Sequence, residues 1–297
     1  VSNISISSIS NGYSVDENCP ATLDFNQSCE LNVTFTPERQ GYAGAILSID
    51  TNDSFENNSS YRFIGYGDGF GTIASSGSHT LLLSTTGNVN SFGLNSSGQL
   101  GDSTTRDRNS SLAVDSLSDI VDVATGLAHS LALNSYGEVF AWGANANGQL
   151  ADGTIVSKNA PQKMLNSLQI GSISSGDHFT VLLDSNGTMY TVGAGSVGQL
   201  ANSIITDKNT LQKVNLDKTI VQVSAGASHV IALAQDGTIY TWGSGTNGQL
   251  GDGNSANQST PFARSDIENV VYVNAGLDTS YAVTADGKLF SWGLNDR

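Results

Sequence analysis

Short apolar stretches separated by glycine-containing breaks recur along most of the chain. In one representative unit, residues 120–123 are followed by a break at Gly126, and then by residues 129–133 and 138–142. In a neighbouring unit the last two stretches are joined by Asn186-Gly187, a dipeptide that tolerates the positive φ of a tight hairpin. The pattern therefore predicts short antiparallel strands connected by tight turns.

The middle stretch is apolar on both sides, unlike a strand with one solvent face. Leu131 and Leu133 point one way and Ala132 points the other, because successive side chains of a strand alternate. A sheet with two apolar faces must lie between two other sheets. A weaker fourth strand is expected at residues 111–114, 161–164, 211–214 and 261–264. Each unit is thus typical of a four-stranded β-propeller blade.

The unit recurs every 50 residues without insertion or deletion. Three series show this: Gly87, Gly137, Gly187, Gly237 and Gly287; Gly93, Gly143, Gly193, Gly243 and Gly293; and the Gly-Gln-Leu elements that contain Gln99, Gln149, Gln199 and Gln249. Trp142, Trp242 and Trp292 share one phase of the repeat, which Phe92 and Val192 occupy in the other two units. These series predict four complete repeats and a truncated fifth.

The most complete copies of the motif lie at residues 124–150 and 224–253, where a His, an apolar stretch, Trp-Gly and Gly-Gln-Leu follow in order. These runs resemble repeats of the regulator of chromosome condensation family, over about residues 70–297. The resemblance implies a seven-bladed propeller. We therefore expect an all-β chain with a partial β-propeller. The fifth unit stops at Asn295, before its Gly-Gln-Leu, so we expect a window cut from a longer protein, with an open ring.

Residues 1–69 lack the repeat and predict a separate β unit, with strands at 4–9, 29–36, 43–51 and 61–66. The run from Cys19-Pro20 to Gly67 resembles the carboxy-terminal half of choice-of-anchor, Hydin-type immunoglobulin-like domains. We therefore expect a partial immunoglobulin-like β-sandwich at 1–69 and propeller repeats at 70–297. The resembled domains often occur on exported bacterial surface proteins. This implies an extracellular or cell-surface location and a Cys19–Cys29 disulfide, with two free thiols as the alternative.

The polar residues of the repeat signature are expected to be structural. His79, His129 and His229 share a phase, but Phe179 and Thr279 occupy it in the other units, so no complete ring of ligands exists. A buried imidazole that bridges backbone groups explains them better. The four signature glutamines are likewise expected to hydrogen-bond backbone groups of their turns. No metal or other cofactor is predicted.

The connecting segments between units are the least alike, and function in a repeat protein is best sought where the copies differ. They hold most of the basic side chains, including Arg106, Arg108, Lys158, Lys163, Lys208 and Lys213. Two interpretations remain open. The charges keep blade edges soluble, or they form a rim that faces a partner.

Composition narrows the function. The 297 residues hold 12 basic and 27 acidic side chains, a net charge of −15, which disfavours a nucleic-acid partner. No apolar run is long enough to insert in a membrane, and no nucleotide-binding, nucleophile-elbow or metal-binding motif occurs. We therefore expect a non-enzymatic module that binds a protein partner.

The family resemblance supplies two alternatives, a guanine-nucleotide exchange factor for a small GTPase and an inhibitor that covers an enzyme's active site. No residue of this chain can be matched to either activity. An enzyme with its site in the central channel is a further hypothesis, for which Asp177 and His178 are the only candidates.

Overall fold

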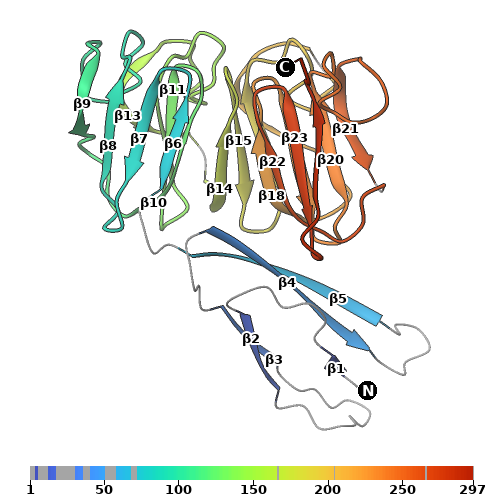
Figure 1. Cartoon of the computed structure of the whole chain (residues 1–297). Helices are drawn as coiled ribbons and strands as arrows, with labels where there is room; N and C mark the ends of the chain where they lie inside the picture. The colour runs from blue at the N-terminus through green and yellow to red at the C-terminus, as the bar shows by residue number, and fades with distance from the viewer. Residues whose placement is uncertain are drawn as a thin grey trace.

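A computed structural model describes residues 72–165, 167–203, 205–264 and 266–296, together with five strands between residues 4 and 67. The described residues form strands, turns and loops, and none of them is helical. The predicted all-β class is confirmed. Figure 1 shows the repeats arranged as a row of sheets around a common axis.

The first five strands form two antiparallel sheets, one with the order β1-β4-β5 and one that pairs β2 with β3. They are β1 (Ile4–Ser5), β2 (Tyr13–Glu17), β3 (Leu31–Phe35), β4 (Gly41–Asp50) and β5 (Asn58–Gly67). Four of them coincide with predicted strands, whereas β2 was not predicted. The immunoglobulin-like class of this unit stays a prediction, and Cys19 and Cys29 lie outside the described residues.

Each following repeat forms one sheet, or blade, in which consecutive strands pair antiparallel. Blades 1 and 2 consist of β6 (Ile73–Ser76), β7 (His79–Leu83), β8 (Val89–Gly93), β9 (Arg108–Ala113), β10 (Ile120–Thr125), β11 (His129–Asn134), β12 (Val139–Gly143) and β13 (Lys158–Lys163). Blades 3 and 4 consist of β14 (Ile170–Ser175), β15 (Phe179–Asp184), β16 (Met189–Gly193), β17 (Lys208–Lys213), β18 (Ile220–Ala225), β19 (His229–Ala234), β20 (Ile239–Gly243) and β21 (Gln258–Arg264). Blade 5 has β22 (Val270–Ala275), β23 (Thr279–Thr284) and β24 (Leu289–Gly293).

The fourth strand of each complete blade begins three residues earlier than predicted, at residues 108, 158, 208 and 258. In blade 1 it starts at Arg108, which pairs with Gly93, and the register shifts between this pair and the Ser91–Leu112 pair. The shift allows a polar start to the strand, which the apolar pattern alone could not reveal. The glycine that ends the third strand is required there: at Gly143 φ is 95°, and an added Cβ would lie 2.5 Å from the carbonyl oxygen of Ala128.

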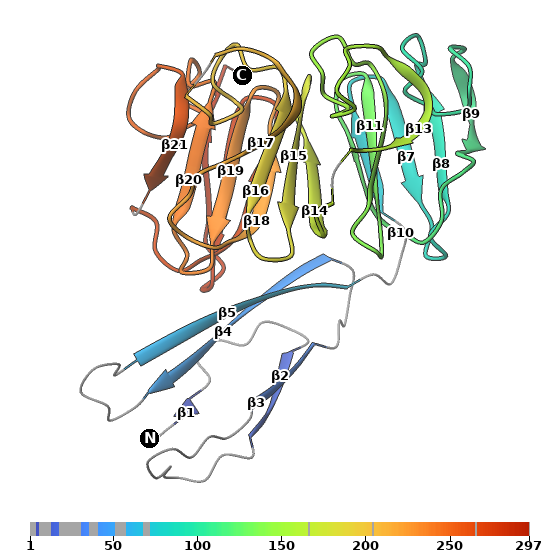
Figure 2. The same ribbon diagram turned by 180° about the vertical axis from the view of Figure 1, so that it is seen from behind.

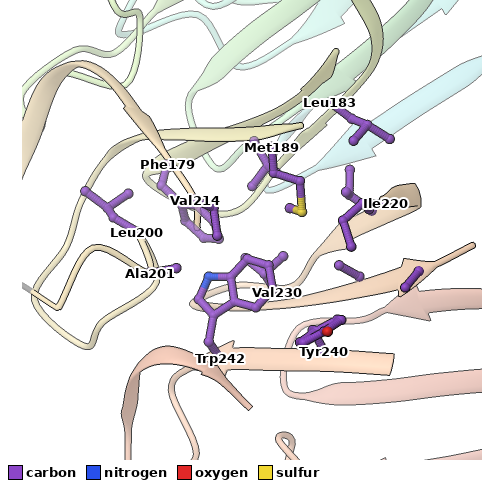
Figure 3. Close-up of a cluster of buried hydrophobic side chains, with 14 residues drawn as sticks. Phe179, Leu183, Met189, Leu200, Ala201, Val214, Ile220, Val230, Tyr240 and Trp242 are labelled. Carbon is purple, nitrogen blue, oxygen red and sulfur yellow. The ribbon is translucent and has the colours of Figure 1, made fainter. Parts of the chain in front are cut away.

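Neighbouring blades pack face to face, as the two-sided apolar pattern predicted. The cluster between blades 1 and 2 contains Leu81, Leu83, Val89 and Val114 from blade 1 and Ile120, Val123, Ala132 and Trp142 from blade 2. Figure 3 shows the equivalent cluster between blades 3 and 4, where Trp242 lies opposite Val214 and Met189. Each blade therefore contributes one apolar face to the preceding blade and the other to the following blade.

The described blades form an open arc with an uncovered sheet face at each end. In blade 5, Leu289 is 67% exposed, whereas its counterparts Val89, Val139, Met189 and Ile239 are at most 2% exposed. In blade 1, Ile73 is 68% exposed, whereas its counterparts Val123, Ile173, Val223 and Val273 are at most 7% exposed. Burial at these positions thus depends on the neighbouring blade and not on the strand itself.

The two ends of every blade differ in structure. The loops between third and fourth strands, residues 94–107, 144–157, 194–207 and 244–257, all emerge at one end, which we name the loop face. The tight hairpins between second and third strands emerge at the other end. Strands β4 and β5 lie beyond the hairpin end in both views (Figures 1 and 2).

Candidate functional site

The signature histidines are buried between blades and bridge them. His79 Nε2 lies 2.9 Å from Ser130 Oγ of the next blade, and that hydroxyl donates to the Gln99 carbonyl oxygen at 2.8 Å. His129 makes the same contact with Thr180 at 3.2 Å, and His229 makes it with Ser280 at 2.9 Å. Each imidazole thus starts a relay that crosses to the following blade and returns.

The relay determines which ring nitrogen of the imidazole carries the proton. Because the Ser130 hydroxyl donates its own proton to Gln99, it must accept the proton of His79 Nε2, which leaves Nδ1 unprotonated. Burial disfavours the charged ring and lowers the pKa of His79 and His229 to about 4 and that of His129 to about 3. These groups are therefore neutral, structural hydrogen-bond donors at neutral pH.

The interface between blades 3 and 4 lacks this relay. Phe179 occupies the histidine position and Val230 occupies the hydroxyl position of the next blade. Both partners are replaced together, so no buried polar group is left without a partner. The paired replacement explains why Phe179 interrupts the histidine series without breaking the fold.

The glutamine element is also internal to the propeller. The Gln99 carbonyl accepts a second bond from Trp142 Nε1 at 2.9 Å, and its side-chain Oε1 accepts the backbone N–H of Ser97 at 2.9 Å. The same indole bond joins Trp242 to Gln199 and Trp292 to Gln249. The Oε1 atoms of Gln149, Gln199 and Gln249 accept the equivalent backbone N–H groups of their own turns. These groups therefore hydrogen-bond within the propeller.

Several of the candidate basic residues are engaged within the chain. Arg108 donates to Asp102 Oδ2 from Nε at 2.9 Å and from Nη2 at 2.6 Å. Lys158 lies 3.3 Å from Asp152, and Lys163 pairs with Glu138. In blade 4 the position is neutral, and Gln258 donates to Asp252 at 3.1 Å. The side chains at these two positions thus hold together the loops of blades 1, 2 and 4.

The remaining three candidate cations make no ion pair with any described residue. Arg106 and Lys208 lie on the loop face, and Lys213 lies at the hairpin end of β17. The structure does not gather the six basic candidates into one rim. Their role toward a partner stays a prediction.

The loop face also exposes apolar side chains that the charge-based reading of the sequence missed. Ile155 and Val156 of the blade 2 loop are 64% and 60% exposed, and Ile205 of the blade 3 loop is 64% exposed. We name these three residues the apolar patch. The counterparts in blades 1 and 4 are small or polar, namely Thr105, Arg106, Ser255 and Ala256. This departure from the repeat was a usable sequence signal.

Direct hydrogen bonds tie the loop of blade 2 to the start of the next blade's fourth strand. Asn147 Nδ2 donates to Asp207 Oδ2 at 2.7 Å, and Gly153 N donates to the Asn209 carbonyl at 3.1 Å. Asn209 Nδ2 returns a bond to the Gly153 carbonyl at 2.8 Å. The loop that carries Ile155 and Val156 is therefore hydrogen-bonded to the segment that directly follows Ile205.

The central channel offers no catalytic constellation within the described residues. It forms a cavity of about 520 Å³ lined mostly by Ser, Ala and Gly of the first strands. Asp177 lines its rim, where burial raises the pKa of this carboxyl, and His178 is exposed beside it. Nowhere in the described ranges do three His, Cys, Asp or Glu side chains gather to hold a metal ion. The described part also has no helix able to cross a membrane.

Four-stranded blades, stacked face to face and built from a 50-residue repeat, define a β-propeller of repeat type. Comparison of the sequence with family models identifies it further. The model of the RCC1-like domain matches residues 49–297, and the chain belongs to that family. No curated protein sequence matches the chain.

Three solved structures similar to this chain share its propeller fold. Human WBSCR16 gives a TM-score of 0.67 at 19% identity, with 93% of this chain and 82% of that chain covered. Yeast Prp20 bound to Kap60 gives 0.65 at 18% identity, with 86% and 65% covered. Prp20p of Saccharomyces cerevisiae, described with its binding properties to Gsp1p and histones, gives 0.63 at 21% identity, with 86% and 66% covered. This chain thus spans about two thirds of Prp20, and the likeness shows the fold.

Proposed function

We propose that the chain is a non-enzymatic propeller module that binds a protein partner through its loop face. The observation that carries the proposal is that the shared and the variable residues of the repeat lie in different places. The signature His, Trp and Gln residues are buried and make contacts within the propeller, whereas Ile155, Val156 and Ile205 are exposed where the copies differ. Exposed apolar side chains on a soluble scaffold mark interaction surfaces.

Composition and resemblance support the partner class and the location that we propose. A net charge of −15 disfavours a phosphate backbone, so the partner is a protein and not a nucleic acid. The resemblance of residues 1–69 to domains of exported proteins supports an extracellular or cell-surface location. Immunoblotting of cell fractions checks the location directly, and recovery of the whole protein in the cytosol would contradict it.

The second candidate is a regulator of a small GTPase that accelerates nucleotide exchange. The favouring observation is the fold shared with Prp20p, which is described as binding Gsp1p. An identity of 21% leaves this activity a proposal for the present chain.

A nucleotide-release assay separates the two candidates. Gsp1p loaded with a fluorescent GDP analogue is mixed with the full chain, with Prp20p as the positive control. We expect the release rate to equal the spontaneous rate, because the proposed module has no dedicated exchange activity. A clear, concentration-dependent acceleration would replace the proposed function with the exchange factor.

A further inference from the structure

We propose that the apolar patch docks an apolar protein segment flanked by carboxylate side chains. The inference rests on the proposed function and specifies the partner chemistry of the same face. It concerns residues 155, 156 and 205 and the two unpaired cations beside them, Arg106 and Lys208.

The patch is not explained by the stability of the fold. The residues that pack against a neighbouring blade lie on the strands, in or directly after the Gly-Gln-Leu elements, and directly after the fourth strands. Ile155, Val156 and Ile205 belong to none of the buried clusters and remain more than half exposed. Thr105 and Ser255 occupy the same phase in blades 1 and 4, so the loop folds without an apolar residue there. Covering these side chains with an apolar segment releases their hydrating water.

Charge complementarity selects the flanks of that segment. Arg106 lies in the blade 1 loop at the phase that Val156 occupies in blade 2, and Lys208 follows the loop of Ile205. The blade 1 loop that carries Arg106 is joined to β13 of blade 2 through Ser103 and Asn159, and Lys208 begins the strand that directly follows the loop of Ile205.

The neighbouring carboxylates are already used. Asp107 accepts the backbone N–H of Asn95 at 2.7 Å, and Asp207 accepts that of Gly195 at 3.0 Å. Asp102 and Asp152 are paired with Arg108 and Lys158. Arg106 and Lys208 make no ion pair within the described residues. An acidic flank on the partner would supply one.

The experiment uses a phage-displayed random peptide library as the probe, selected against the immobilised full chain. Parallel selections use I155S/V156S/I205S, which removes the patch, and R106E/K208E, which reverses the flanking charge. The matched control is Y136S/L165S. It removes two side chains that are 64% and 73% exposed at the hairpin end of blade 2. All seven substitutions lie at exposed or half-buried positions, and circular dichroism verifies that each variant folds.

We expect the wild type and Y136S/L165S to enrich the same peptides, with an apolar core flanked by Asp or Glu. Their affinity should fall at least tenfold for I155S/V156S/I205S. It should also fall for R106E/K208E, and for the wild type when NaCl is raised from about 50 to about 500 mM. Peptides that bind the patch variant undiminished, or whose flanks are basic, would overturn the inference but leave the protein-binding function in place. The absence of any enriched peptide would contradict both.

Discussion

The free energy of unfolding of the full chain is expected to fall steeply as the pH is lowered from about 6.5 to about 4. Three buried histidines have folded-state pKa values of about 3 to 4, below their ordinary value of 6.5. Above pH 6.5 the three rings are neutral in the folded and the unfolded chain. Below pH 6.5 the rings bind protons in the unfolded chain but stay neutral in the folded chain, and this proton uptake favours unfolding. A shift of this size is worth about 3 kcal/mol per histidine. Together the three approach the total stability of a typical domain.

One other buried group works in the opposite direction. Burial raises the pKa of Asp122 to about 6, so its protonation on acidification stabilises the folded chain. Repulsion from His79 and then from His178 lowers the pKa of His129 further, in the same direction as burial. Burial also raises the pKa of the half-buried Asp177, which acts in the same direction as Asp122. With three buried histidines against these two carboxyls, the net effect of acid remains destabilising.

Urea unfolding of the wild type at a series of pH values measures the effect, and the chain offers its own control. The variant H79F/S130V copies the Phe179 and Val230 pair of the third interface, and the Gln99 carbonyl keeps its bond from Trp142. The variant should fold and lose about one third of the acid sensitivity, because one of three buried imidazoles is gone. An unchanged pH dependence in this variant would show that the relays do not carry it.

Removal of the equivalent apolar side chain should destabilise the fold strongly in blade 4 and only slightly in blade 5. Ile239 and Leu289 occupy the same repeat position, but Ile239 is fully buried and Leu289 is 67% exposed. Ile239→Ala should therefore cost about 2 to 5 kcal/mol of unfolding free energy, through lost burial and a residual cavity. Leu289→Ala should cost less than about 0.5 kcal/mol, because its side chain is already largely in water.

Urea unfolding of both variants at low protein concentration checks the pair. Equal and large costs would mean that the outer face of blade 5 is covered in solution. Repeating the measurement across a range of concentrations would then show whether a second copy of the chain provides the cover.

Much of the architecture could be predicted because the same pattern of apolar residues and turn glycines recurs in five units. Alternating Leu131, Ala132 and Leu133 requires two packed faces, and the structure places these side chains in the clusters on either side of blade 2. The hairpin glycines adopt positive φ, as at Gly187, where φ is 79°. Strand β2 escaped prediction because its sequence, Tyr-Ser-Val-Asp-Glu, has too short an apolar alternation.

The site was less predictable because it depends on contacts between units. Arg108 and Lys158 looked available in the sequence, but the strand shift that starts β9 and β13 brings them onto Asp102 and Asp152. The His79–Ser130 relay spans two repeats, so it is hidden from any pattern read within one unit. The apolar patch was visible as a departure from the repeat, but only the exposed fractions show that these side chains are not core residues.

Hydrogen–deuterium exchange of the full chain, with and without the most strongly enriched peptide, tests the central claim directly. That claim is that the interior signature builds the scaffold and the loop face binds the partner. We expect slower exchange on binding in loops 144–157 and 194–207, with no change in the hairpin turns that contain Gly137 and Gly187. Protection confined to those hairpin turns or to the channel strands would contradict the account.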